Sequence, residues 1–87
     1  MYVIAVYDVD ARRTQKMLKV CRRYLNWIQN SVFEGEITEV KLKELILKCK
    51  KIMDLETDSF IIFRNPQANW LEKQVIGCEK APTDQYL

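Results

Sequence analysis

The sequence predicts an α/β (α+β) sandwich in which two helices lie on one face of a single sheet. Three patterns carry this prediction: a short apolar run opens the chain, two amphipathic helical stretches follow, and a second apolar run lies near the end. Each helical stretch has one apolar face, so both helices must be buried against the same side of the sheet. At 87 residues the chain is expected to form one domain, residues 1–87.

The first strand is expected over Tyr2–Val9, where Val, Ile and Tyr form a continuous apolar run. Such a run is typical of a strand that is buried on both faces. A helix then begins at Ala11 or Arg12 and ends near Leu25. Its apolar residues recur at spacings of three and four: Met17, Leu18, Cys21, Tyr24 and Leu25. Asp10 stands directly before this helix, where a carboxylate can accept hydrogen bonds from backbone N–H groups of the first turn.

The middle of the chain predicts an extended region followed by a second helix. Residues 26–37, NWIQNSVFEGEI, fit either one bent strand or two short strands with a tight reversal. Thr38 is the expected N-cap of a helix that ends near Met53. The apolar stripe of this helix consists of Leu42, Leu45, Ile46, Cys49, Ile52 and Met53.

The last third of the chain is predicted to add two strands. One covers Ser59–Arg64 and ends at Asn65-Pro66, because proline cannot donate to a sheet. Residues 67–71 fit one helical turn, and Glu72–Cys78 fits an edge strand. The order of strand, helix, extended pair, helix, strand and strand predicts a ferredoxin-like βαββαβ sandwich.

Apolar residues on both sides of strands 2–9 and 59–64 indicate that both faces of the sheet are covered. The helices cover only one face. A second copy of the chain is the simplest cover for the other, so we predict a homodimer whose sheets pack face to face.

Residue types narrow the possible chemistry and location. Cys21, Cys49 and Cys78 form no C-x-x-C pair and are expected to be free thiols. The chain has no histidine, which excludes His general bases, Ser/His/Asp triads and His-ligated zinc. Hydrolysis would therefore depend on carboxylates with a hard cation such as Mg²⁺. No apolar run is long enough to span a bilayer and no signal-peptide pattern opens the chain, so we expect a cytoplasmic protein without membrane contact.

Basic residues are concentrated in residues 11–33, which carry six bases and no acid, although the net charge of the chain is only +2. Solvent-exposed helices usually mix the two signs, so an unmixed stripe indicates a polyanionic partner. Without base-edge readers, such residues would contact the nucleic-acid backbone. The candidates for phosphate contact are Arg12, Arg13, Lys16 and Arg23.

Asp8 interrupts the first strand at its C-terminal end, where ligands tend to bind in open α/β sheets. If the strand continues, Asp8 and Asp10 point to opposite faces. Both can be ordinary strand-end and N-cap residues, or Asp8 can belong to a metal site. One carboxylate is a poor Mg²⁺ site, but a twofold axis would supply a second Asp8.

Several aromatic residues are candidates for stacking on bases, although strand aromatics are more typical of a core or an interface. They are Trp27, Phe33, Phe60, Phe63 and Trp70.

Two stretches resemble a known family: VYDV at 6–9 with the basic helix after it, and QNSVFEGEIT at 29–38 followed by a helix rich in Leu, Lys and Glu. They are similar to the small core CRISPR-associated nuclease family, whose members accompany the integrase in CRISPR adaptation. The resemblance extends through DSFIIFR to VIG at 75–77. It implies a ferredoxin-like homodimer in which the C-terminal segment, residues 77–87, adds a strand to the partner's sheet.

The resemblance also implies an active site. Asp8 of both subunits would bind Mg²⁺, or Mn²⁺, and be the catalytic residue, and the residues facing nucleic acid would be Arg12, Arg13, Ser31 and Phe33. The implied activity is a metal-dependent endonuclease on single-stranded RNA or double-stranded DNA, acting with the integrase in spacer acquisition. Two alternatives stay open, a non-catalytic DNA-binding scaffold of the integration complex and a toxin-like endoribonuclease of the same fold; SVFEGE favours the CRISPR-type functions over the latter.

Overall fold

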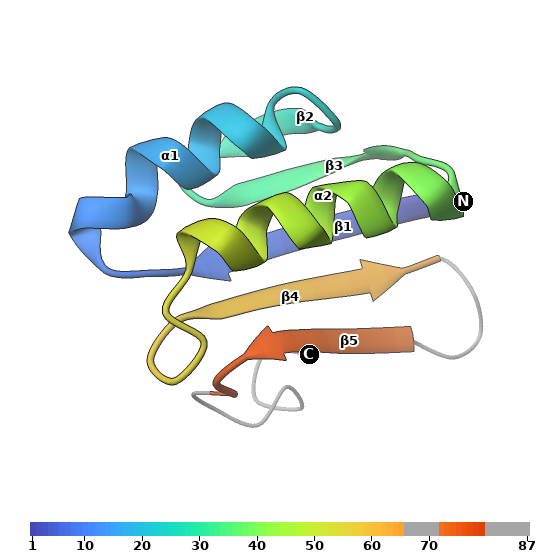
Figure 1. Cartoon of the computed structure of the whole chain (residues 1–87). Coiled ribbons are helices and arrows are strands. Elements are labelled where there is room, and N and C mark those ends of the chain that lie inside the picture. The colour runs from blue at the N-terminus through green and yellow to red at the C-terminus, as the bar shows by residue number, and fades with distance from the viewer. Residues whose placement is uncertain (66–71, 80–87) are drawn as a thin grey trace.

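A computed structural model describes residues 1–65 and 72–79 and shows a single sheet with both helices on one face (Figure 1). Its elements are β1 (Tyr2–Asp8), α1 (Ala11–Cys21), β2 (Asn26–Gln29), β3 (Val32–Glu36), α2 (Glu39–Ile52), β4 (Ser59–Arg64) and β5 (Glu72–Gly77). The strand order is β2-β3-β1-β4-β5, and every neighbouring pair is antiparallel. The predicted ferredoxin-like sandwich is confirmed, with β5 as the edge strand beside β4. The expected helical turn at 67–71 and residues 80–87 lie outside the described residues.

Helix α1 ends at Cys21, four residues earlier than the sequence predicts. Residues 22–24 form a turn, and the N–H of Leu25 donates to the carbonyl oxygen of Cys21 at 2.9 Å. The β-forming residues of β2 follow at once, which favours leaving the helix at this point. Arg23 therefore lies beyond the helix, and the predicted basic stripe on α1 ends at Lys19.

The stretch 26–37 forms two strands joined by a tight turn, which decides between the two predicted alternatives. Asn30 and Ser31 make the turn between β2 and β3. Asn30 has a φ of 44°, a left-handed conformation that Asn adopts more readily than most residues. The pairing register shifts between Trp27 and Gln29, so the irregularity of this hairpin lies in β2.

Both predicted N-caps are confirmed. The carboxylate of Asp10 accepts from the N–H of Arg12 at 2.9 Å, and the hydroxyl of Thr38 accepts from the N–H of Lys41 at 3.2 Å. Each bond satisfies a backbone donor that has no partner within the helix. Neither of the two described helices combines the length and the apolar character needed to cross a membrane.

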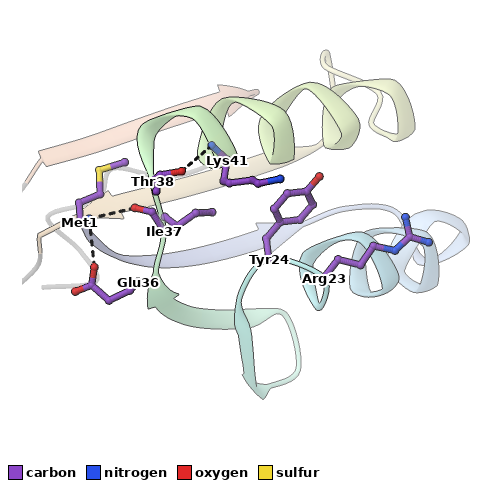
Figure 2. A pocket seen from close by; sticks show the side chains of 7 residues that line it. All are labelled: Met1, Arg23, Tyr24, Glu36, Ile37, Thr38 and Lys41. Carbon is purple, nitrogen blue, oxygen red and sulfur yellow. Dashed lines mark hydrogen bonds and ion pairs between the residues drawn. The ribbon is translucent and has the colours of Figure 1, made fainter.

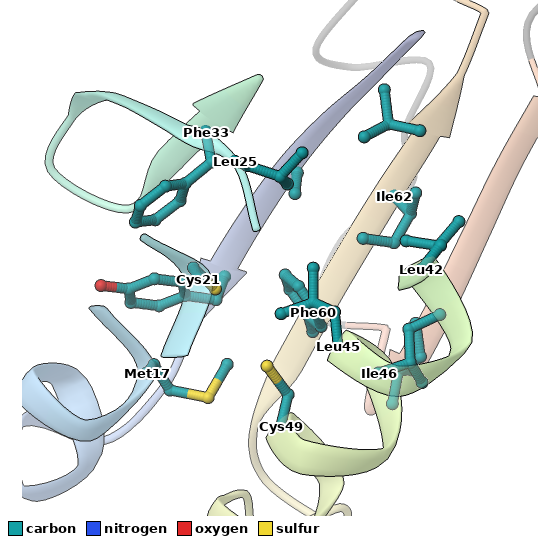
Figure 3. Packing of buried hydrophobic residues seen from close by; sticks show 14 of the residues in the cluster. Met17, Cys21, Leu25, Phe33, Leu42, Leu45, Ile46, Cys49, Phe60 and Ile62 are labelled. Carbon is teal, nitrogen blue, oxygen red and sulfur yellow. The ribbon is translucent and has the colours of Figure 1, made fainter. Parts of the chain in front are cut away.

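The hydrophobic core lies between the two helices and the sheet (Figure 3). Alternate residues of β1 point into it, as the two-residue repeat of a strand requires. The largest contributions from the sheet are Phe33 and Phe60, and those from the helices include Met17, Leu42 and Leu45. All three cysteines are free thiols, as predicted. Cys21 and Cys49 are buried, and the hydrogen bond to Cys49, together with burial, raises the pKa of the Cys21 thiol.

The opposite face of the sheet is also apolar, and no described helix covers it (Figure 1). Strand alternation and register place six apolar side chains there: Ile4, Val6, Val32, Ile61, Phe63 and Val75. These side chains stay partly exposed, whereas the apolar residues that point toward the helices are buried. A second copy of the chain as the cover of this face stays a prediction.

Candidate functional site

Polar side chains from several segments lie together at one end of the sheet, along the edge that runs across the strands where β1 ends. Because β1 is antiparallel to β3 and β4, the end of β1 lies beside the β2–β3 turn and beside the start of β4. Asp8, the last residue of β1, pairs in register with Ser59, and α1 begins three residues after Asp8. The predicted site at the end of β1 therefore lies where the start of a helix and a hairpin turn meet the sheet.

A hollow of about 310 Å³ lies at this edge. It is lined by Tyr7, Asp8, Val9, Thr14, Asn30 and Ser31. The N–H of Tyr7 donates to the carbonyl oxygen of Ser31 at 3.2 Å, which holds the hairpin turn against β1. The Asp8 side chain is exposed, and alternation along β1 assigns it to the sheet face without helices. The structure thus brings together Asp8 and Ser31, which the sequence analysis selected from separate stretches.

The oxygen donors at this edge suit a hard cation, but one chain supplies too few of them. The carboxylate of Asp8 is the kind of ligand that Mg²⁺ prefers. Within residues 1–65 and 72–79, no group of three or more His, Cys, Asp or Glu side chains could hold a metal ion. A Mg²⁺ site at Asp8 is therefore chemically reasonable only if a second chain contributes further ligands.

Asp10 has a different position from Asp8. Its carboxylate accepts from both the N–H and the Nε of Arg12, each at 2.9 Å. Both bonds lower the pKa of Asp10, and the bond from the backbone N–H has the larger effect. Asp10 is therefore the helix cap that the sequence predicts, and its carboxylate is turned toward α1.

A partly buried ion pair that no local sequence pattern indicates lies next to the backbone of Asp10. The guanidinium of Arg13 binds both carboxylate oxygens of Asp58, at 2.6 and 3.1 Å. The Asp58 carboxylate also accepts from the N–H groups of Asp10 at 3.1 Å and Asp54 at 2.9 Å. The residue is only 1% exposed, and the hydrogen bond from Arg13 lowers its pKa to about 2. Asp58 thus joins the start of α1 to the loop before β4.

The end of β5 packs against the same residue. The N–H of Cys78 donates to the carbonyl oxygen of Asp58 at 2.8 Å. Gly77 has a φ of 90°, and a Cβ at this position would clash with that carbonyl oxygen. The chain therefore needs a glycine where β5 ends, and Asp58 fixes three segments at the edge that carries Asp8.

The side chain of Arg13 is 19% exposed. Two of its guanidinium nitrogens donate to Asp58, so this ion pair competes with the predicted contact between Arg13 and nucleic acid. Arg13 was selected because it belongs to a run of bases. A buried carboxylate 45 residues away leaves no sign in that local pattern.

The other predicted phosphate-binding residues are exposed but do not converge on Asp8. The side chain of Arg12 is 79% exposed at the start of α1, and Lys16 is exposed one turn further along the helix. Arg23 instead lines a second cleft of about 430 Å³ with Tyr24 and Lys41 (Figure 2). Its other lining residues are Met1, Glu36, Ile37 and Thr38. Because this cleft adjoins the start of β1 and the start of α2, it lies at the opposite end of the sheet from Asp8.

The aromatic candidates separate into core and surface residues. Phe33 is fully buried, as is Phe60, so the expected side-chain contact between Phe33 and nucleic acid is corrected to a packing role. Phe63 belongs to the sheet face without helices. Trp27 is the exception, since 49% of its surface is exposed. Trp70 lies outside the described residues.

Comparison with known proteins identifies similar sequences along the whole chain. The family described as CRISPR associated protein Cas2 matches residues 1–73. The chain is 47% identical over 87 residues to the CRISPR-associated endoribonuclease Cas2 of Dictyoglomus turgidum, and the match covers all of both chains. It is 41% identical over 92 residues to the protein of the same name in Fusobacterium nucleatum, covering all of this chain and 87% of the relative.

Solved structures of similar proteins share the fold. A crystal structure described as cas2 has a TM-score of 0.68 and 39% sequence identity, and the match covers 94% of this chain and 92% of that one. The structure of Streptococcus pyogenes Cas2 at pH 6.5 has a TM-score of 0.70 and 30% identity, covering 80% and 90% of the two chains.

Proposed function

The chain belongs to the Cas2 family of CRISPR-associated proteins, and we propose that it is a metal-dependent endonuclease that hydrolyses phosphodiester bonds in CRISPR adaptation. One observation carries the proposal: an exposed carboxylate, Asp8, lines a hollow together with Ser31 at the end of β1, in a chain 47% identical to a relative named endoribonuclease. The proposed substrate is single-stranded RNA or double-stranded DNA. The proposed partner in spacer acquisition is the integrase.

A homodimer would complete the site. The apolar face of the sheet without helices also carries Asp8 at its edge. Packing this face against the same face of a second chain would bury side chains such as Ile4, Val6 and Ile61. It would also bring two copies of Asp8 to one interface. Such a dimer supports the metal site because it doubles the number of carboxylates.

The side chains at the edge have separate tasks in the proposed reaction. Asp8 from each subunit would hold Mg²⁺, which supplies a Lewis acid for the phosphate and lowers the pKa of a bound water. The hydroxyl of Ser31 can donate a hydrogen bond to a phosphate oxygen within the hollow. Arg12, exposed at the start of α1, can neutralise phosphate charge. Lys16 and Lys19 extend this positive surface along the helix.

The test compares two carboxylates that lie two residues apart. Asp8→Asn is expected to reduce Mg²⁺-dependent cleavage roughly 100-fold or more, because loss of even an outer-shell partner of a metal ligand costs about 10- to 100-fold. Asp10→Asn is the matched control, since Asp10 caps α1 and should leave cleavage within a few-fold. Cleavage of single-stranded RNA and duplex DNA is followed with Mg²⁺ and with a chelator.

Equal cleavage by the parent protein and a rigorously purified Asp8→Asn variant would contradict the proposed catalytic role of Asp8. The non-catalytic scaffold has its own support, because the basic surface of α1 does not depend on Asp8. Duplex binding without any cleavage by the parent protein would establish that alternative.

A further inference from the structure

Trp27 is a large apolar side chain on the surface of an edge strand. It belongs to β2, the outermost strand on its side of the sheet, and it is 49% exposed. Tryptophan is usually among the most buried residues on average, so an exposed indole that the fold holds in place indicates a contact surface. Among the residues that the structure describes, the other exposed large apolar side chains are aliphatic: Ile28, Val40, Leu47 and Leu55.

Two interactions hold the indole of Trp27 in place. Its Nε1–H donates to the carbonyl oxygen of Asn30 at 2.9 Å, and the guanidinium carbon of Arg22 lies 5.6 Å from the ring centroid. The only polar atom of the side chain is thus satisfied, and the exposed remainder is aromatic ring. Because these two interactions already hold the ring, the Trp27 side chain loses little further conformational entropy when a ligand stacks on it.

The charges around the ring favour a polyanion over an apolar protein segment. Arg22 is exposed in the turn between α1 and β2, and the stretch 11–33 contains no acidic residue. Aromatic rings flanked by cations are the usual device for holding single-stranded nucleic acid, since the ring stacks on a base and the cations meet the phosphates.

The same turn connects this ring to the hollow at Asp8. Asn30, whose carbonyl oxygen holds the indole, also lines the hollow with Asp8 and Ser31. Only two residues lie between Trp27 and Asn30, so their Cα atoms are at most about 10 Å apart. One strand of nucleic acid lying in the hollow could therefore place a nearby base on Trp27. A base paired within a duplex has no exposed face to offer.

We infer that Trp27 and Arg22 form a stacking platform for an unpaired base of single-stranded nucleic acid, beside the hollow that contains Asp8. This inference rests on the proposed function, in that it assumes nucleic acid as the ligand. It adds a specificity: the platform strengthens binding of single strands and leaves binding of duplexes unchanged.

Binding measurements on the full chain test the platform. All proteins carry Asp8→Asn to prevent cleavage and Trp70→Phe to leave Trp27 as the single indole, since the sequence has two tryptophans. Affinities for a single-stranded RNA and for a DNA duplex of the same sequence are measured by fluorescence anisotropy. Trp27→Ala should weaken single-strand binding about 5- to 100-fold, the range for loss of one stacking aromatic, and leave duplex binding within about twofold.

Four further measurements make the test specific. Trp27→Phe keeps an aromatic ring and should retain most of the single-strand affinity. Arg22→Gln should weaken single-strand binding about two- to fivefold, as expected for an exposed cation–π contact. Ile28→Ala is the matched control, because it removes the similarly exposed neighbour of Trp27, and it should change neither affinity. Single strands, unlike duplexes, should quench the Trp27 fluorescence of the parent protein.

Unchanged single-strand affinity in Trp27→Ala would overturn the platform and leave the proposed function intact. An equal loss of single-strand and duplex binding would also overturn it. A Trp27→Ala variant with normal affinities but an altered sedimentation coefficient would show that another protein chain, and not a base, covers the ring. If the parent protein binds neither nucleic acid, the proposed function fails together with the platform.

Discussion

Asp8 and Asp58 lie at the same edge of the sheet, but their surroundings are opposite. Asp58 is 1% exposed, and its carboxylate accepts N–H bonds from Arg13 and from two backbone groups. Asp8 is exposed and lines a hollow beside Ser31. A buried carboxylate that is hydrogen-bonded within the chain stabilises the fold, whereas an exposed carboxylate that lines a hollow can be reached by a ligand from solvent. Burial therefore assigns different roles to two acids at the same edge of the sheet.

The largest expected effect is on stability, from Asp58→Asn. The change leaves the partly buried guanidinium of Arg13 without its counter-charge, so the free energy of unfolding should fall by roughly 3 kcal/mol. Urea unfolding at one fixed protein concentration measures it, because a dimer's stability depends on concentration. Asp8→Asn, at the exposed acid, should change the same quantity by less than about 0.5 kcal/mol. Equal losses in the two variants would remove the contrast between the two acids.

Acid should reduce the stability that the Asp58 carboxylate gives the fold, and it should do so over a defined pH range. The hydrogen bond from Arg13 lowers the pKa of Asp58 from 3.8 to about 2. A carboxyl group with a lower pKa in the folded state stabilises the fold above its unfolded pKa, and this stabilisation is lost as the pH falls through the folded pKa. The loss therefore lies between about pH 4 and pH 2 and amounts to roughly 2 kcal/mol.

The pH measurement compares urea unfolding of the parent protein and Asp58→Asn between about pH 5 and pH 2. The difference in unfolding free energy between the two should narrow as the pH falls, because the variant has no carboxyl group to protonate at this position. A difference that stays constant over this range would show that the Asp58 carboxylate does not supply the stabilisation.

Local patterns in the sequence were sufficient to predict most of the fold. The strand Ser59–Arg64 and the caps Asp10 and Thr38 depend on neighbouring residues, so they could be identified from the chain itself. The end of α1 could not, because helical spacing continues to Leu25 while the backbone leaves the helix after Cys21. Competition between helix and strand propensities is decided by packing, which the sequence does not display.

The site was predicted in part for the same reason. Asp8 ends β1 and Ser31 directly precedes β3, and antiparallel pairing of the two strands brings these positions together. The pair of Arg13 and Asp58 joins residues 45 positions apart, so no local pattern signals it. Phe33 was assigned to nucleic acid by family resemblance, but strand alternation places it in the core between the partly exposed Val32 and Glu34.

The smallest expected effect comes from two neighbouring arginines, Arg12 and Arg13, which show the same contrast between an exposed and a paired side chain. Arg12 is 79% exposed, whereas the Arg13 guanidinium is held by buried Asp58. If Arg12 contacts one phosphate, Arg12→Gln should weaken nucleic-acid binding a few-fold and reduce the slope of log K against log[salt] by about 0.7–0.9, with little effect on stability. Arg13→Gln should lower the unfolding free energy by roughly 3 kcal/mol and leave the salt slope unchanged in folded protein. A reduced slope in Arg13→Gln would instead show that its guanidinium leaves Asp58 to bind phosphate.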